Sequence, residues 1–133
     1  MTTSAWPLAL RIAHGCMAAL FSYAVYVQHN DVDPIVWMAV YGAAGLLSSL
    51  AAAGRGTWHA PVLLAAVALL WGLALAPRVL GKQSLLDSEE GREMLGLFIT
   101  AAWMALLSAT TFGRRHAPRA APVVEGRART EET

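Results

Sequence analysis

The chain has 133 residues, of which 56% are apolar and only 14% are charged, and its formal net charge is +1. A soluble domain usually carries about 25% charged residues, so these long segments without charge exclude an ordinary soluble domain and indicate a membrane protein. No basic patch with interleaved aromatic residues is present, which excludes a nucleic-acid partner, and the single cysteine, Cys16, excludes an internal disulfide.

The first predicted membrane span covers about residues 8–28 and follows Trp6 and Pro7. Tryptophan suits the membrane interface, and proline fits the first turn of a helix, where its missing N–H has no partner to lose. His14 lies beside a row of small residues and is interpreted either as a packing residue or as a ligand or proton carrier. The row predicts a face for close helix contact and consists of Gly15, Ala19, Ser22 and Tyr26.

A polar cluster follows this span at Gln28-His29-Asn30-Asp31-Val32-Asp33-Pro34. Asn30 is expected to take the left-handed conformation that ends a helix, and Asp33 before Pro34 is a good N-cap. Helix ends do not explain Gln28, His29 or Asp31, which makes all three candidates for function, with His29 the weakest. The second span is predicted over about residues 34–53, with a polar and small face made of Trp37, Tyr41, Gly45, Ser48 and Ala52.

The third span is predicted over about residues 60–80, after a loop that contains Trp58 as an interfacial anchor. The loop that follows this span ends in a second polar cluster, Asp87-Ser88-Glu89-Glu90-Gly91-Arg92-Glu93, which holds four of the nine acidic residues. The pattern Asp87-x-x-Glu90 predicts a capping box, with Glu89 and Glu90 in the first helical turn.

Glu93 lies deeper in the fourth predicted span, residues 89–112, where helix capping does not account for a carboxylate. At about 100° per residue it shares one helix face with polar and small residues further along. Polar residues inside a membrane span should face the bundle rather than lipid. The predicted face consists of Glu89, Glu93, Gly96, Thr100, Trp103 and Leu107.

These elements predict an all-α membrane protein, an antiparallel four-transmembrane-helix bundle over residues 1–112, with a disordered C-terminal tail over residues 113–133. Four spans place both termini on one side. Basic residues on that side and in the second loop are Arg11, Arg55, Arg114, Arg115, Arg119, Arg127 and Arg129, whereas the other side has Arg78, Lys82 and Arg92. Because cytoplasmic loops are enriched in Lys and Arg, we expect a multi-pass protein of the cell's inner (plasma) membrane with both termini and the tail in the cytoplasm.

Two motifs resemble the transmembrane protein 220 family: Gln28-x-Asn30-Asp31-x-Asp33-x-x-x-Trp37-x-x-x-Tyr41 and Glu89-Glu90-Gly91-Arg92-Glu93-x-x-Gly96-Leu97. The resemblance extends from Arg11 to about Trp103 and leaves out the tail. It implies a small polytopic membrane protein and supports the choice of these motifs, but it supplies no mechanism.

The first and third loops lie at the same end of an antiparallel bundle, so we expect one extracytoplasmic polar site there. Its candidate residues are Gln28, Asn30, Asp31, Asp33, Trp37, Tyr41, Glu89, Glu90, Arg92 and Glu93. Two carboxylates that meet in a low dielectric cannot both stay charged alone. Either one of them holds a proton, or Arg78 or Arg92 pairs with it, or a cation lies between them, and a metal would be held by Asp31, Glu90 and Glu93.

Three functions are compatible with these residues, and no sequence motif for a cofactor is found. The expected function is a binding or accessory subunit in the lipid bilayer, within a larger membrane complex or a homo-oligomer, for which a bound cation is left open. The second is a membrane-embedded enzyme that uses paired carboxylates, with or without a metal, and for which no catalytic residue is assigned. The third is a purely structural subunit in which Arg78 and Arg92 neutralise the acids.

Overall fold

The structure, a computed structural model, describes residues 7–81 and 84–118. It contains four α-helices in chain order, α1 (Leu8–Gln28), α2 (Pro34–Ala52), α3 (His59–Val79) and α4 (Glu89–His116), and no strand occurs within these two ranges. Each of the four helices is long and apolar enough to cross a membrane. The prediction of an all-α membrane protein is confirmed.

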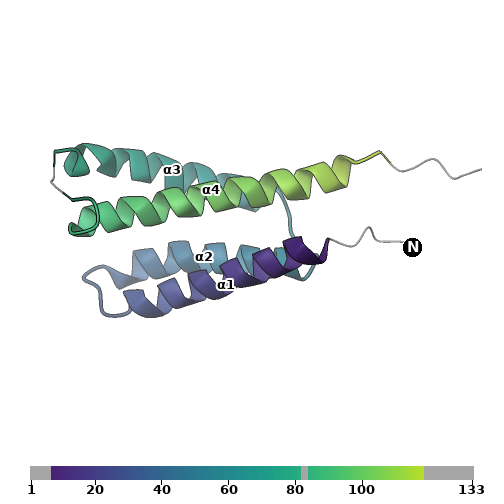
Figure 1. Ribbon diagram of the computed structural model, residues 1–133, viewed down its shortest axis with the longest axis horizontal. Helices are drawn as coiled ribbons and strands as arrows, with labels where there is room; N and C mark the ends of the chain where they lie inside the picture. The colour runs from purple at the N-terminus through teal and green to yellow at the C-terminus, as the bar shows by residue number, and fades with distance from the viewer. Residues whose placement is uncertain (1–6, 82–83, 119–133) are drawn as a thin grey trace, which may run out of the picture.

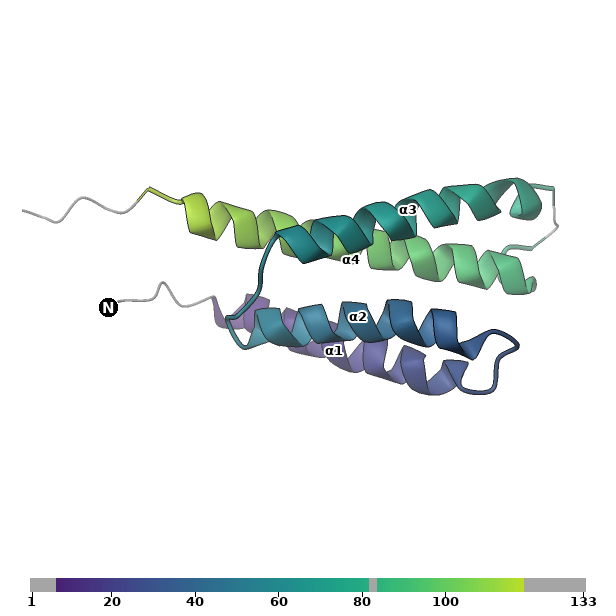
Figure 2. The same cartoon turned by 180° about the vertical axis from the view of Figure 1, so that it is seen from behind.

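The helices form two antiparallel hairpins, α1 with α2 and α3 with α4, which lie one against the other (Figure 1). Figure 2 shows the same two layers from behind, with the second loop joining α2 to α3 at the end where α1 begins. The α1–α2 loop and the start of α4 lie together at the opposite end (Figure 1). This is the predicted antiparallel four-helix bundle.

The interface between the two hairpins is formed mainly by α2, which contacts both α3 and α4. Trp37 of α2 stacks on Trp71 of α3, with 5.0 Å between the ring centroids. Trp103 of α4 donates a hydrogen bond from Nε1 to Oγ of Ser48 on α2, at 3.0 Å. Such specific contacts hold helices together in lipid because the hydrophobic effect does not favour one apolar surface over another there.

Large apolar side chains cover the outside of the bundle, whereas several hydroxyl groups lie inside it. Leu63 and Leu70 are each 68% exposed, while Ser48 and Thr100 are fully buried. Both hydroxyls donate to a backbone carbonyl one turn earlier in their own helix, so their burial leaves no unsatisfied donor. In a soluble protein large apolar side chains are mostly buried and polar ones mostly exposed, so this surface is suited to lipid rather than to water.

The ends of three helices fall within one residue of the predicted spans, but α4 extends to His116 rather than to residue 112. The last turn of α4 is basic, which the helix dipole favours. Arg115 also donates from Nη2 to the carbonyl oxygen of Gly56 in the second loop, at 3.3 Å. The predicted disordered tail therefore does not begin at residue 113, and its residues 119–133 lie outside the described ranges.

The caps of two helices differ from the prediction. Ser88 caps α4 rather than Asp87, because the helix starts at Glu89 and the Ser88 hydroxyl accepts from the Gly91 N–H at 3.1 Å. Asp33 holds the N-cap position of α2, but its side chain makes no cap hydrogen bond. The prediction for Asn30 is wrong, since only glycines have positive φ among the residues described.

The face that α1 turns toward the bundle lies one residue away from the predicted row of small residues. Gly15 is exposed, and a Cβ built there would meet nothing within 4 Å. One residue rotates a helical position by about 100°, so the wrong row points outward. The close approach to α2 is instead at Gly45, where a Cβ would lie 3.4 Å from the Phe21 Cβ. The inner face consists of His14, Ala18, Phe21, Val25 and Gln28.

Candidate functional site

The two polar clusters meet at one end of the bundle. Gln28 ends α1 and Pro34 begins α2, so the first cluster forms the loop of the first hairpin. The second cluster forms the start of α4, and Figure 1 shows this start at the same end as that loop. The antiparallel topology therefore brings together residues about 60 positions apart in sequence, as expected from short connections in a bundle.

Glu93 lies where the two hairpins face each other at this end. Its side chain is half-buried, one turn inside α4. Like-charge interactions reach it from its own helix and from the first loop. It also interacts electrostatically with the buried Tyr41 of α2. The acidic residues that act on it are Glu89, Asp31, Glu90 and Asp33.

Neither nearby arginine neutralises this carboxylate. The exposed Arg92 donates from Nη1 to the carbonyl oxygen of Leu86, at 3.2 Å, which directs it toward the third loop. Arg78 is also exposed, and within the described part of the chain no ion pair joins either arginine to Glu93. Among the described residues, then, Glu93 is not seen to pair with Arg78 or Arg92, while the other expected ways to hold the two carboxylates together stay predictions.

Two aromatic residues of α2 form the inner wall of the site. Trp37 and Tyr41 are 5% and 7% exposed, and their rings stack with centroids 6.1 Å apart. Trp71 stacks on the far side of Trp37 and limits its movement. The Tyr41 hydroxyl reaches the surface of α4 at Gly96, one turn below Glu93. A rigid aromatic wall thus lies between the carboxylate and the centre of the bundle.

A groove between α1 and α4 opens beside this wall and has a volume of about 310 Å³. Most of its lining is apolar, but the Gln28 side chain lies at one end. Its Oε1 atom is buried and accepts no hydrogen bond from the described residues. The lining residues are Leu20, Phe21, Tyr23, Ala24, Val27, Gln28, Tyr41, Gly96 and Ile99. We refer to this feature as the α1–α4 groove.

The other candidate residues lie around the edge of the site. Asn30, Asp33 and Glu89 are exposed, and Glu90 is half-buried. Asp31 is half-buried and accepts from the Val32 N–H at Oδ1, at 3.1 Å, which fixes its position in the loop. The four carboxylates among these residues contribute negative charge to the opening, whereas Asn30 is neutral.

The expected metal ligands Asp31, Glu90 and Glu93 do not come together in a cluster that could hold a metal ion. Within residues 7–81 and 84–118, no group of three or more His, Cys, Asp or Glu side chains lies close enough to hold a metal ion. The arrangement is an acidic opening near an apolar groove.

Reasoning from sequence missed the apolar half of the site. Leu20, Ala24 and Gln28 recur every four residues on α1, so helical periodicity places them on one face. The sequence does not indicate that this face meets α4 across a gap. His14, the other polar residue of the inner face, is fully buried nearer the terminal end and lies edge-on against Trp103, with ring centroids 5.4 Å apart.

Residues 20–109 are similar to a family described as "Transmembrane family 220, helix". The chain is also similar to transmembrane protein 220 of Xenopus laevis, with 30% identity over 107 residues that cover 72% of this chain and 56% of the relative. The chain thus matches little more than half the length of that relative. No solved structure matches the chain significantly. The matched range includes both polar clusters and the α1–α4 groove.

Proposed function

This chain belongs to the transmembrane protein 220 family, and from that premise we propose that it is a small binding or accessory protein of the plasma membrane. Its binding site is the opening of the bundle between the α1–α2 loop and the start of α4. The opening receives a positively charged group of a ligand or of a partner subunit. We call it the acidic mouth, and it consists of Asp31, Asp33, Glu89, Glu90 and Glu93.

The observation that carries this proposal is the position of Glu93. Carboxylates from both hairpins act on it, and no arginine pairs with it among the described residues. Charges repel more strongly where protein and lipid lower the effective dielectric constant. A cationic group in the mouth would relieve this repulsion at Glu93.

The distribution of basic residues supports an outward-facing mouth. The end opposite the mouth carries the second loop with Arg55 and the arginine-rich end of α4. Cytoplasmic segments carry the excess of Lys and Arg in membrane proteins. A ligand would therefore enter from the extracytoplasmic solution or from the outer leaflet.

The test compares Glu93→Gln with Glu89→Gln, a matched control on the exposed first turn of the same helix. Purified protein in detergent is titrated with ethylammonium chloride, with sodium chloride at equal ionic strength as the reference. At a tenfold excess over Kd, bound ethylammonium should stabilise the wild type by about 1.4 kcal/mol, and Glu89→Gln should keep more of this gain than Glu93→Gln does. Glu93→Gln should lose most of this gain, because half-buried Glu93 is where the like charges converge. Thermal unfolding is the measurement.

The proposal is wrong if ethylammonium stabilises the wild type no more than sodium does. It is equally wrong if Glu93→Gln keeps the full gain. A partner subunit would present the same chemistry through a lysine or arginine side chain. In that case a larger complex should co-purify with the wild type in mild detergent and be lost with Glu93→Gln but kept with Glu89→Gln.

A further inference from the structure

Arginine side chains from three parts of the chain converge on the second loop, at the end of the bundle opposite the acidic mouth. Arg11 of α1 donates from Nε to the carbonyl oxygen of Ala52, at 3.1 Å. Arg115 of α4 donates from Nη2 to the carbonyl oxygen of Gly56, at 3.3 Å. Arg55 lies between these two acceptors in the sequence and is exposed. We call Arg11, Arg55 and Arg115 the arginine cluster.

The backbone of the second loop holds Arg55 in a fixed position. Gly54 follows the end of α2 with a positive φ of 76° and donates to the carbonyl oxygen of Ala51, at 2.9 Å. The Arg55 N–H donates to the carbonyl oxygen of Leu50, at 2.8 Å. These two hydrogen bonds form a Schellman motif, which ends the helix in a defined geometry. Arg55 is therefore held beside the carbonyl that Arg115 contacts.

The described residues provide no carboxylate next to the arginine cluster. Their acidic residues all lie in the α1–α2 loop, the third loop or the first turns of α4, at the mouth end (Figure 1). A carbonyl oxygen carries no net charge, so the hydrogen bonds of Arg11 and Arg115 orient the guanidinium groups without neutralising them. Like charges that are gathered at a membrane surface repel one another unless an anion lies between them.

The arginine cluster lies at the depth of phospholipid headgroups. Helix α2 ends at Ala52, and its 19 residues rise by about 28 Å, close to the thickness of the hydrocarbon core. Trp58 follows in the same loop and packs edge-on against Phe112 of α4, with ring centroids 5.4 Å apart. Tryptophan side chains are enriched at the membrane interface. The anions that a guanidinium group meets at this depth are the phosphate groups of lipids.

We propose that the arginine cluster binds an anionic phospholipid, whose phosphate group lies between Arg55 and Arg115. Guanidinium groups bind phosphate in a bidentate geometry, and Arg115 keeps N–H donors beyond the one given to Gly56. A zwitterionic lipid also has a phosphate group, but its ammonium group cancels the charge and is repelled by the same arginines. The cytoplasmic leaflet carries the anionic lipids, which agrees with the orientation proposed for this end. This inference does not depend on the ligand of the acidic mouth.

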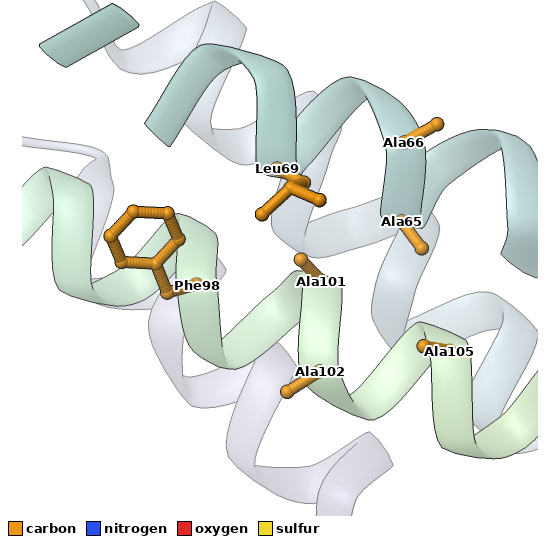
Figure 3. Close-up of a pocket in the computed structure, with 7 residues that line it drawn as sticks. All are labelled: Ala65, Ala66, Leu69, Phe98, Ala101, Ala102 and Ala105. Carbon is orange, nitrogen blue, oxygen red and sulfur yellow. The ribbon is translucent and has the colours of Figure 1, made fainter. Parts of the chain in front are cut away.

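A groove between α3 and α4 provides a control for contacts with acyl chains. It has a volume of about 430 Å³, and Figure 3 shows that its lining is made of alanine, leucine and phenylalanine side chains. Leu69 lines it and is 45% exposed. Since no charged side chain lines this groove, a substitution here changes the packing of acyl chains but not the preference for one headgroup.

The experiment uses native mass spectrometry of the purified full chain with an equimolar mixture of phosphatidylglycerol and phosphatidylcholine that carry identical acyl chains. We expect the wild type to retain more phosphatidylglycerol and Arg55→Gln to lower the ratio of the two lipids about fivefold, the factor typical of one arginine at an anionic membrane surface. Arg78→Gln removes the same charge at the mouth end, where Arg78 is exposed in the last turn of α3. Arg78→Gln and Leu69→Trp should both keep the wild-type ratio.

Arg55→Gln tests the site without disturbing the fold, because the Arg55 side chain makes no hydrogen bond within the described part of the chain, and circular dichroism checks each variant. A ratio near one in the wild type overturns the proposal. Equal losses in Arg55→Gln and Arg78→Gln overturn it too, since the lipid would then respond to overall charge. In a second arm, thermal unfolding compares phosphatidylglycerol with inorganic phosphate at equal concentration. If phosphate alone stabilises the wild type as much, the occupant is a free anion and the lipid assignment is wrong.

Discussion

Gly96 is the residue at which α4 leaves room for the wall of the site. A Cβ at this position would overlap the Tyr41 hydroxyl oxygen. The end of a flexible side chain could move away, but Tyr41 is buried between the rings of Trp37 and Phe21. Only glycine therefore allows the tyrosine to reach α4 below Glu93, which gives a structural reason for the Glu93-x-x-Gly96 spacing.

Substitution of Gly96 by alanine should destabilise the bundle. Overpacking of this kind costs about 1–3 kcal/mol, which exceeds the gain of up to about 1 kcal/mol that alanine brings to a helix. Gly15→Ala is the matched control, since nothing lies within 4 Å of its Cβ position, and it should be neutral or stabilising. Adding Tyr41→Phe to Gly96→Ala should restore most of the loss. Thermal unfolding in detergent measures all three variants against the wild type, and equal effects at Gly96 and Gly15 would contradict this account.

At the scale of helices, the seam between the two hairpins depends on a few directed contacts. The hydrogen bond from Trp103 to Ser48 joins α4 to α2, and Ser108 joins α4 to the second loop by donating to the carbonyl oxygen of Trp58, at 2.9 Å. Because the facing surfaces of the two hairpins are about as apolar as lipid, the hydrophobic effect does not select one alignment, and these hydrogen bonds set how the hairpins align. The position of Glu93 opposite the first loop follows from that alignment.

A double-mutant cycle should detect the coupling across this seam. The coupling free energy between Trp103→Phe and Ser48→Ala is expected to be about 0.6 kcal/mol, and about 1.7 kcal/mol is the upper limit for interhelical hydrogen bonds in membranes. Ser49→Ala is the control, because Ser49 donates to the carbonyl oxygen of Gly45 in its own helix. Unfolding free energies in mixed micelles supply the cycle. If the coupling free energy between Trp103→Phe and Ser49→Ala were as large as that between Trp103→Phe and Ser48→Ala, the coupling would not come from the Trp103–Ser48 hydrogen bond.

At the scale of the whole molecule, charge is divided between the two ends. The acidic mouth lies at one end, and the basic last turn of α4 lies at the other, where Arg115 also contacts the second loop. Arg11 donates from Nε to the carbonyl oxygen of Ala52 at this same end, at 3.1 Å. Basic side chains thus hold the terminal end together, and because cytoplasmic loops are enriched in Lys and Arg, we propose that this end faces the cytoplasm.

Cysteine labelling should reveal this orientation. In a Cys16→Ala background, Val32→Cys in the α1–α2 loop should react with a membrane-impermeant maleimide in intact cells, because Val32 is 86% exposed at the mouth end. Thr57→Cys, exposed in the second loop, should react only after the membrane is opened. The reverse pattern would place the mouth in the cytoplasm.

The sequence predicted the number of helices in the described ranges, the bounds of the first three and the inner face of α4, because each depends on local patterns. A run of about 20 apolar residues specifies a span, and a polar stripe in it must face inward. The inner face of α1 was missed because small residues occupy two of its faces, so composition did not distinguish Gly15 from Ala18. The α1–α4 groove was missed for a different reason, since it depends on the distance between two helices that are far apart in sequence.

Because the chain consists of two successive hairpins, the two halves of the site are synthesised one after the other. The ribosome makes the chain from its N-terminus, so α1 and α2 pair in the bilayer before α4 has been synthesised. During that interval Ser48 lacks Trp103, and Asp31 lacks the opposing carboxylates. The mouth therefore forms only once α4 has begun to be made, and a defect at the seam should leave membrane insertion intact while it prevents the two halves of the site from meeting.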